Sequence, residues 1–201
     1  MIHSKDIMLV KTIAPVPDEI FQPALAEINS INWQQIKDPY RGSAKVFATS
    51  TAVHIRTHQP PAGQPMPTTI EEWSVITECA NHPENYTKYP GIVNTANWIM
   101  QQVSGQALGR IMIIELEPWG HVGLHVDPLD YFAMYSRFHI PFKTNPRVVF
   151  SGGAGTANEH MAYQHLCQLN NRLPHSLINR SDQSRIHLLV DIAVEGGNQI
   201  F

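Results

Sequence analysis

The sequence predicts a mainly β fold with flanking helices, and two observations support this fold class. From Gly109 onward the chain is a series of short runs rich in β-branched and aromatic residues, separated by Gly, Pro, Asn and Asp. Short strands at close, regular spacing are typical of a β-sandwich or barrel. Before Gly109, two stretches instead carry apolar residues at helical spacing. We therefore expect a single domain over residues 1–201, with a helical and β support region over residues 1–108 and a β core over residues 109–201.

The support region contains two predicted helices among strands and loops. The first helix includes Pro23, which is normally tolerated only near a helix start, and the second ends at the stop signal Gly105. The elements expected there are a strand over Ile7–Ile13, a helix over Pro17–Ile31, a strand over Lys45–His58, a proline-rich loop over Gln59–Thr69, a segment over Thr68–Ala80 that fits either helix or strand, and a helix over Pro90–Gly105.

The β core consists of predicted strands joined by short turns. The runs that we expect to form strands are, in chain order, GRIMIIELEP, HVGLHVD, YFAMYSRFHIPF, RVVFSGG, HMAYQHLCQL, HSLIN and RIHLLVDIAV. All the candidate site residues discussed below lie in this part of the chain.

Composition and charge exclude several classes of protein. The net charge of −3 gives no electrostatic reason to expect a nucleic acid or an anionic membrane as partner. We find no N-terminal signal pattern and no apolar run of membrane-spanning length. The two cysteines, Cys79 and Cys167, have neither a metal-like spacing nor the number typical of a disulfide framework. These features favour a soluble protein of the reducing cytoplasm.

The 11 histidines are the unusual part of the composition, and two of them lie in a pattern that suggests a metal site. In HVGLHVD, His125 and Asp127 are two positions apart, so a strand would present an imidazole and a carboxylate on one face. His175 opens a second short strand 50 residues later (175 − 125 = 50). Two histidines and one carboxylate that leave open positions are the ligands of non-haem Fe(II) oxygenases.

Arg185 stands at the head of the apolar run RIHLLVDIAV, ten residues after His175 (185 − 175 = 10). A guanidinium that faces into a barrel needs an anion, and its planar fork suits a carboxylate. We therefore expect Arg185 to bind a carboxylate-bearing cosubstrate whose other end reaches the metal.

These residues resemble the Fe(II)/2-oxoglutarate-dependent dioxygenases, and more particularly the aspartyl/asparaginyl β-hydroxylase family in its bacterial or phage form. The matching phrases are ELEPWGHVGLHVD, SRFHIPF and LPHSLINRSDQSRIHLLVDI, which together cover roughly the last 90 residues. The resemblance implies a double-stranded β-helix (jelly-roll, cupin-like) as the catalytic core over residues 109–201. It also implies Fe(II) held by His125, Asp127 and His175, with 2-oxoglutarate and dioxygen as cosubstrates. Chemistry would take place at the metal centre, and no separate acid or base is assigned.

The phrase SRFHIPF carries a further implication of this resemblance. In the family, an arginine and a histidine two residues apart contact the metal-bound end of 2-oxoglutarate, and Arg137 and His139 match them. A serine that helps to hold the far carboxylate corresponds to Ile114 here, which leaves more of that task to Arg185 or to a neighbouring hydroxyl group. Candidates for this hydroxyl group are Ser176 and Tyr135.

Two other departures from the family pattern, and one further histidine, concern the site. The animal enzymes have a glycine where this chain has Asp127, so this chain has the fuller ligand set. EPWG replaces the usual proline-glycine turn, and we expect Trp119 to line the mouth of the site. By alternation His121 shares a face with His125, so we consider it for a position behind the metal ligands.

The expected function is hydroxylation of an aspartyl or asparaginyl side chain, or of a free amino acid such as proline. Two alternatives from other classes remain open: a zinc-dependent hydrolase that uses the same three ligands, and a non-catalytic cupin-like binding module. The hydrolase leaves Arg185 unexplained, whereas the binding module would use it to hold a carboxylate ligand without turnover.

Overall fold

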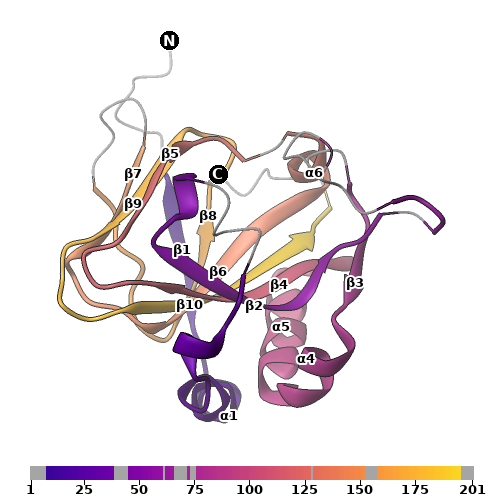
Figure 1. Cartoon of the computed structure of the whole chain (residues 1–201), viewed down its shortest axis with the longest axis horizontal. Coiled ribbons are helices and arrows are strands. Elements are labelled where there is room, and N and C mark those ends of the chain that lie inside the picture. The colour runs from indigo at the N-terminus through magenta and orange to yellow at the C-terminus, as the bar shows by residue number, and fades with distance from the viewer. Residues whose placement is uncertain are drawn as a thin grey trace.

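Two antiparallel sheets packed face to face form the protein (Figure 1), as seen in a computed structural model that describes residues 8–38, 45–60, 62–65, 72, 76–127, 129–152 and 158–195. The strands of the larger sheet, in spatial order, are β1 (Val10–Pro15), β8 (His165–Leu169), β6 (Tyr135–Lys143), β10 (Arg185–Ala193), β4 (Ala107–Leu116), β2 (Ser50–His58) and β3 (Cys79–Asn81). Those of the smaller sheet are β5 (His121–His125), β9 (His175–Asn179) and β7 (Val148–Gly152). The predicted mainly β, jelly-roll fold is confirmed.

The helical elements are α1 (Asp18–Asn29), α4 (Pro83–Lys88), α5 (Pro90–Gln102) and α6 (Leu129–Met134), with short 3₁₀ turns η1 (Trp33–Gln35) and η2 (Lys45–Phe47). Helices α1, α4 and α5 cover the outer face of the larger sheet, away from the smaller one, whereas α6 lies apart from them (Figure 1). The helices predicted around Pro23 and before Gly105 are α1 and α5. The apolar faces of α1 and α5 pack on the larger sheet in one core. Burial of apolar area in this core stabilises both the helices and the sheet.

Strand β10 shows how the larger sheet separates this outer core from the interior between the sheets. Ile186, Leu188 and Val190 belong to the outer core with the helices. The alternate residues of β10 point to the other face, where Arg185 lies over the ring of Phe150 of β7 in the smaller sheet. Both faces of β10 are buried along nearly its whole length, so its charged residues need partners in the interior.

A β-bulge in β5 turns His125 toward the interior. Val122 pairs with Leu177 of β9 and His125 pairs with His175, so three steps along β5 oppose two along β9. Val122 therefore packs with Leu177 in the core between the sheets, and His125 still faces inward beside His175. The alternation that placed His121 on the face of His125 is wrong, because His121 precedes the bulge and is exposed.

Several predicted boundaries differ from the observed ones. Residues 131–134 form the end of helix α6 rather than the start of a strand, and β6 begins at Tyr135. Residues 45–47 form the turn η2, and β2 begins at Ser50. The predicted strand start at Ile7 and much of the segments over Gln59–Thr69 and Thr68–Ala80 lie outside the described residues.

The larger sheet unites the two parts of the chain. It takes β1, β2 and β3 from residues 1–108 and β6, β8 and β10 from residues 109–201. Among the described helices, none combines the length and the apolar character needed to cross a membrane.

Candidate metal centre

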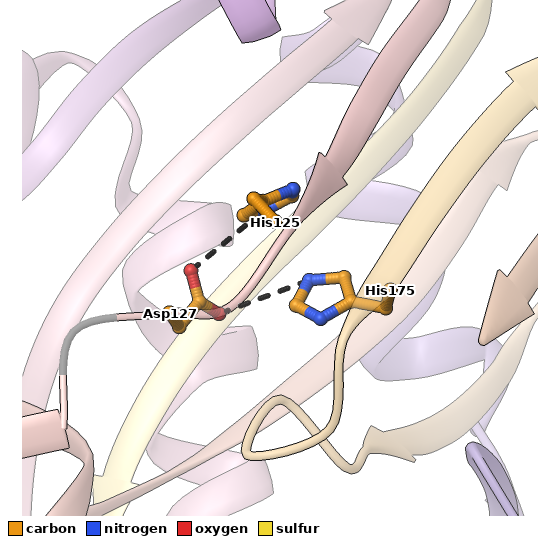
Figure 2. Close-up of side chains that lie close together, drawn as sticks. All are labelled: His125, Asp127 and His175. Atoms are coloured by element: carbon orange, nitrogen blue, oxygen red, sulfur yellow. Dashed lines mark ion pairs between the residues drawn. The ribbon is translucent and has the colours of Figure 1, made fainter. Parts of the chain in front are cut away.

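Three side chains from two strands of the smaller sheet converge on one point. His125 ends β5, His175 begins β9, and these two residues are paired across the strands. Asp127 follows β5 by two residues, and its carboxylate faces both imidazoles from one side (Figure 2). His125 Nε2 is 3.8 Å from Asp127 Oδ1, and His175 Nε2 is 4.0 Å from Asp127 Oδ2. One ligand atom from each residue lies within 4.8 Å of the other two.

Backbone hydrogen bonds fix which nitrogen of each imidazole is available. His125 Nδ1 lies 2.8 Å from the carbonyl oxygen of Gly123, and His175 Nδ1 lies 2.9 Å from that of Leu173. A carbonyl oxygen only accepts, so each Nδ1 carries the proton and donates. Each Nε2 then keeps its lone pair on the side of Asp127, which is the tautomer that a divalent metal needs. The donor set therefore fits a metal ion with two imidazoles and one carboxylate.

A buried chain of alternating charges holds the carboxylate of Asp127. Arg137 Nη1 donates to Asp127 Oδ2 over 2.6 Å, and Arg137 Nε donates to Asp191 Oδ1 over 2.9 Å. Asp191 also accepts from Arg110 Nε over 2.8 Å. Asp191 is completely buried and Arg137 is nearly so, and this is tolerable because two guanidinium groups balance two carboxylates. With Oδ2 bound to Arg137, Oδ1 is the oxygen that faces His125.

The protonation states at this centre suit metal binding. Burial alone would raise the pKa of Asp127, but the positive charge of Arg137, with smaller effects from other cations, lowers it below the usual 3.8. Burial lowers the pKa of His175 below 6.5, and the Asp127 charge only partly opposes this shift. At neutral pH Asp127 is therefore ionised and His175 is neutral, which are the forms that bind a divalent cation.

Two aromatic residues of α6 cover the arginines of this chain. The guanidinium carbon of Arg137 lies 4.6 Å from the ring centre of Phe132, and that of Arg110 lies 4.7 Å from the ring centre of Tyr131. The hydroxyl oxygen of Tyr131 accepts a hydrogen bond of 2.9 Å from the backbone N–H of Arg110. Helix α6, which follows Asp127 in the chain, thus seals the charged network from water and strengthens its interactions.

The second part of the site lies along the interior face of β10. Arg185 is 2% exposed, and its Nη2 lies 2.5 Å from His187 Nδ1. This contact directs the guanidinium along β10 toward Asp191, which lies at the metal end. His139 is buried on β6, with its ring centre 5.8 Å from that of His187 and 6.2 Å from that of Phe150. A cation and two imidazoles therefore lie together on the interior faces of β10 and β6.

Besides His121, three further residues were expected near the site, and Trp119 and Ser176 lie away from it. Trp119 is 64% exposed in the turn between β4 and β5, at the opposite end of β5 from His125, which corrects its expected place at the mouth of the site. Ser176 occupies the outward face of β9, where its hydroxyl donates to the carbonyl oxygen of Ser151. Tyr135 stacks on Tyr131 at 4.5 Å between ring centres.

Ile114, which stands where the family has a serine, faces the interior. It packs with Met112 and Leu189 in a small apolar cluster and lies directly opposite His187 of the neighbouring strand. No hydroxyl group is supplied at this position, and of the two expected alternatives Ser176 bonds to Ser151 while Tyr135 stacks on Tyr131.

Neither Asp191 nor Arg110 was predicted from the sequence to be part of the site. The signal for both was present, because each is a charged residue inside a run that reads as a buried strand, as Arg185 does. A buried charge without a partner is costly, so such residues predict one another as partners.

One protein family and several solved structures resemble this chain. The family model for aspartyl/asparaginyl β-hydroxylase matches residues 29–194. A prolyl hydroxylase from Trichoplax adhaerens, solved in complex with a peptide fragment of the hypoxia inducible factor oxygen degradation domain, is 8% identical, with 92% of this chain and 84% of that chain covered and a TM-score of 0.61. An oxidoreductase of the 2OG-Fe(II) oxygenase family from Burkholderia pseudomallei is 13% identical over 86% of this chain and 79% of that chain, with a TM-score of 0.53.

A prolyl-4-hydroxylase from Pseudomonas putida is 12% identical, with 93% of each chain covered and a TM-score of 0.52. At these identities the structural likeness concerns the fold. None of the curated proteins matches this chain.

Proposed function

Because the chain belongs to the aspartyl/asparaginyl β-hydroxylase family, as the sequence resemblance predicted, we propose that it is an Fe(II)- and 2-oxoglutarate-dependent hydroxylase. The observation that carries the proposal is the convergence of His125, Asp127 and His175 above an interior that contains a buried arginine. Two imidazoles and one carboxylate bind Fe(II) and leave other coordination positions for ligands.

Each residue of the site has a defined task in this proposal. His125 and His175 bind the metal through Nε2, and Asp127 binds it through Oδ1 while Arg137 holds Oδ2. When bound, Fe(II) and 2-oxoglutarate supply the activation of dioxygen that ends in hydroxylation of a C–H bond. Arg185 binds the distal carboxylate of 2-oxoglutarate, because its planar fork matches a carboxylate in two hydrogen bonds.

Arg137 and His139 also belong to the cosubstrate side of the proposal. Arg137 carries positive charge at the metal, and His139 lies below it on the same face of β6, two residues along. Their positions suit contact with the metal-bound end of 2-oxoglutarate. Helix α6 and the aromatic rings on the arginines keep water from this region, which strengthens such contacts.

The substrate that we propose is an aspartyl or asparaginyl side chain of a peptide, or a free amino acid such as proline. The family supports the first class. A free amino acid as substrate is supported by the sequence, in which we find no repeat module for binding a polypeptide. We also place the enzyme in the cytoplasm, since Cys79 and Cys167 are free thiols and a reducing compartment keeps thiols in this form.

A spectroscopic titration tests the cofactors of this proposal. Anaerobic addition of Fe(II) and 2-oxoglutarate should give a weak visible charge-transfer band. Asp127→Ala should abolish the band, whereas Asp182→Ala should retain it because Asp182 is exposed in the turn between β9 and β10. Binding of Zn(II) with no band and no dependence on 2-oxoglutarate would instead support a zinc hydrolase.

A turnover assay then tests the substrate class. Succinate release should rise when the correct free amino acid or an Asp- or Asn-containing peptide is added, and the product should gain the mass of one oxygen atom. A protein that forms the band but releases no succinate above the uncoupled background with any of these substrates would be a binding module rather than a hydroxylase.

A further inference from the structure

His187 is a completely buried histidine that the proposed site does not yet use. It lies on β10, two residues after Arg185, so both side chains face the interior between the two sheets. Its cross-strand neighbours, Ile114 of β4 and Pro141 of β6, offer no side-chain hydrogen-bonding group. Its Nε2 atom has no hydrogen-bond partner among the described residues. Because such a buried polar group costs free energy, packing alone does not explain an imidazole at this position.

The other nitrogen of the ring, Nδ1, faces Arg185. The Nη2 atom of Arg185 lies 2.5 Å from Nδ1, and a guanidinium can only donate, so Nδ1 accepts. Nδ1 can accept only while the imidazole is neutral, and burial, together with the charge of Arg185, holds the pKa of His187 well below 6.5. At pH 7 the contact is therefore a hydrogen bond and not a repulsion between two cations.

This hydrogen bond fixes where the guanidinium of Arg185 lies. At roughly 3.3 Å per residue, position 187 is about 7 Å further along β10 toward Asp191, so the contact extends Arg185 toward the metal end. Phe150 of β7 covers the same group from the smaller sheet, with 5.7 Å between the guanidinium carbon and the ring centre. The ring of His139 packs against that of His187, with 5.8 Å between ring centres. The guanidinium is thus held along the strand by His187 and across the sheets by Phe150.

We propose that His187 is a positioning residue that holds Arg185, through Nδ1, in the orientation that binds the distal carboxylate of the cosubstrate. This inference rests on the proposed function and deepens it. The contact uses one of the five N–H groups of the guanidinium, so it is compatible with a carboxylate that accepts from two others. Orientation matters because Ile114 supplies no hydroxyl group, and the carboxylate therefore depends more on Arg185. An arginine that is already ordered loses less conformational entropy when the ligand binds.

Ligand binding to Zn(II)-loaded protein, measured by calorimetry, tests the proposal without turnover. The probes 2-oxoglutarate and pyruvate share the 2-oxo acid group, but only 2-oxoglutarate has a distal carboxylate. His187→Leu should weaken 2-oxoglutarate binding about three- to tenfold, which corresponds to the cost of ordering one long side chain. The affinities for pyruvate and Zn(II) should stay within about twofold of wild type, because neither ligand depends on Arg185.

Two amide variants identify the atom of His187 that acts. In His187→Asn the amide oxygen is attached to Cγ, as Nδ1 is in histidine, and it should restore most of the 2-oxoglutarate affinity by accepting from Arg185. His187→Gln is the matched control, because it has the same amide one carbon further out, near the position of Nε2. It should bind 2-oxoglutarate more weakly than His187→Asn does. Equal affinities for the two amide variants, or a higher affinity for His187→Gln, would contradict a role of Nδ1.

A double-mutant cycle with Arg185→Ala tests whether His187 acts through the arginine. If it does, His187→Leu should cause no further loss of 2-oxoglutarate affinity in the Arg185→Ala background. An equal loss in both backgrounds would show that His187 acts independently of Arg185, and the positioning role would be wrong.

The outcomes distinguish this inference from the proposed function. If wild type binds 2-oxoglutarate and His187→Leu binds it equally well, or loses pyruvate to the same extent, the positioning role is wrong and the proposed function stands. If wild type binds Zn(II) but not 2-oxoglutarate, the proposed cosubstrate is wrong and this inference falls with it. Should His187→Leu not fold, the comparison of His187→Asn with His187→Gln decides, since both variants keep a polar side chain.

Discussion

Asp191 holds the two arginines beside the metal centre, although it is not one of the three candidate metal ligands. Its two oxygens bind Arg137 and Arg110, and Arg137 in turn binds Asp127. Each buried charge has an opposite charge as hydrogen-bond partner, so the removal of any one leaves another buried and uncompensated. The orientation of Asp127 therefore depends on a residue 64 positions away in the chain (191 − 127 = 64).

Asp191→Asn should weaken metal binding although residue 191 is not a ligand. The amide cannot balance the charges of Arg137 and Arg110, so the guanidinium that fixes Asp127 Oδ2 loses its anchor. Loss of a residue that orients a ligand typically costs 10- to 100-fold in metal affinity, and we expect about tenfold or more. The measurement is a competitive Zn(II) titration with a chromophoric chelator on folded protein.

The matched control for this experiment is Asp182→Asn. Asp182 is exposed in the turn before the same strand, and its change removes the same charge. Equal Zn(II) affinities for Asp191→Asn and Asp182→Asn would contradict the role of Asp191.

At the scale of elements, helix α5 begins without a capping side chain of its own. Tyr89 precedes the helix and makes no side-chain cap, but Glu27 of α1 reaches the exposed N–H groups. Its two oxygens accept from Gly91 N–H over 2.7 Å and from Ile92 N–H over 2.9 Å. A carboxylate at a helix N-terminus gains from both these hydrogen bonds and the helix dipole.

Glu27→Ala should lower the free energy of unfolding by about 2 kcal/mol, because two charge-assisted hydrogen bonds are lost. Glu27→Gln should cost roughly half as much, since one carbonyl oxygen remains as acceptor. Glu19→Gln is the matched control: Glu19 is exposed in the first turn of α1, and its change should cost only a few tenths of a kcal/mol. Urea denaturation measures all three, and equal costs for residues 27 and 19 would contradict the capping role.

Helix α6 is held against β4 at Gly109. A Cβ atom at residue 109 would lie 2.2 Å from the hydroxyl oxygen of Tyr131 and 2.9 Å from the ring of Tyr135. Neither ring is free to move, since the two stack on each other and Tyr131 Oη accepts from the backbone of Arg110. The absence of a side chain at Gly109 therefore lets α6 approach the arginines that it covers.

Gly109→Ala should destabilise the protein by about 1–3 kcal/mol through overpacking. Tyr131→Phe removes the nearest clashing atom, so the double variant should be more stable than the sum of the two single changes predicts. A double-mutant cycle of urea denaturation measures this coupling. Strict additivity would show that the glycine is not needed for the approach of Tyr131.

The elements also show where sequence periodicity is sufficient and where it fails. The period of α5 and the runs of the back half predicted helix and strands, because packing on one or both faces leaves a direct pattern. The bulge in β5 left no such pattern, since Val122 and His125 both face inward at odd spacing. Helix α6 has only six residues, too few for its aromatic residues to be distinguished from those of the strand that follows.

For the molecule as a whole, residues 1–108 support the site rather than form it, and we propose this as their role. They supply the two main helices and three strands of the larger sheet, whereas the proposed metal and cosubstrate residues follow Gly109. The ligand set was predictable because its spacing and residue types restrict the chemistry. Which of the buried charges meet was not, since the pairing of Arg110, Arg137 and Asp191 depends on the register of β4, β6 and β10.

The interior of the folded protein keeps several histidines neutral, which predicts acid sensitivity of the metal-free protein. Burial lowers the pKa of His58 from 6.5 to about 3 and holds that of His187 well below 6.5. Between these values the unfolded chain binds protons that the folded protein excludes, so the free energy of unfolding falls as the pH falls below about 6.5. The contribution of these neutral histidines to stability is complete above that pH. It is lost as the pH falls toward their pKa values in the folded protein.

Each such histidine adds a slope that approaches 1.4 kcal/mol per pH unit below pH 6.5, so we expect a loss of about 4 kcal/mol between pH 7 and pH 5 from His58 and His187 together. Asp127 acts in a separate window, because its lowered pKa stabilises the fold above about pH 3.8 and this contribution is lost only below. Urea denaturation of the chelator-treated protein across pH 4–8 measures the effect. In His58→Gln the free energy of unfolding should fall less steeply between pH 6.5 and pH 5. Unfolding should take up nearly one proton fewer, because glutamine does not titrate. A free energy of unfolding that stays constant from pH 7 to pH 5 would show that these imidazoles gain protons in the folded protein as readily as in the unfolded chain.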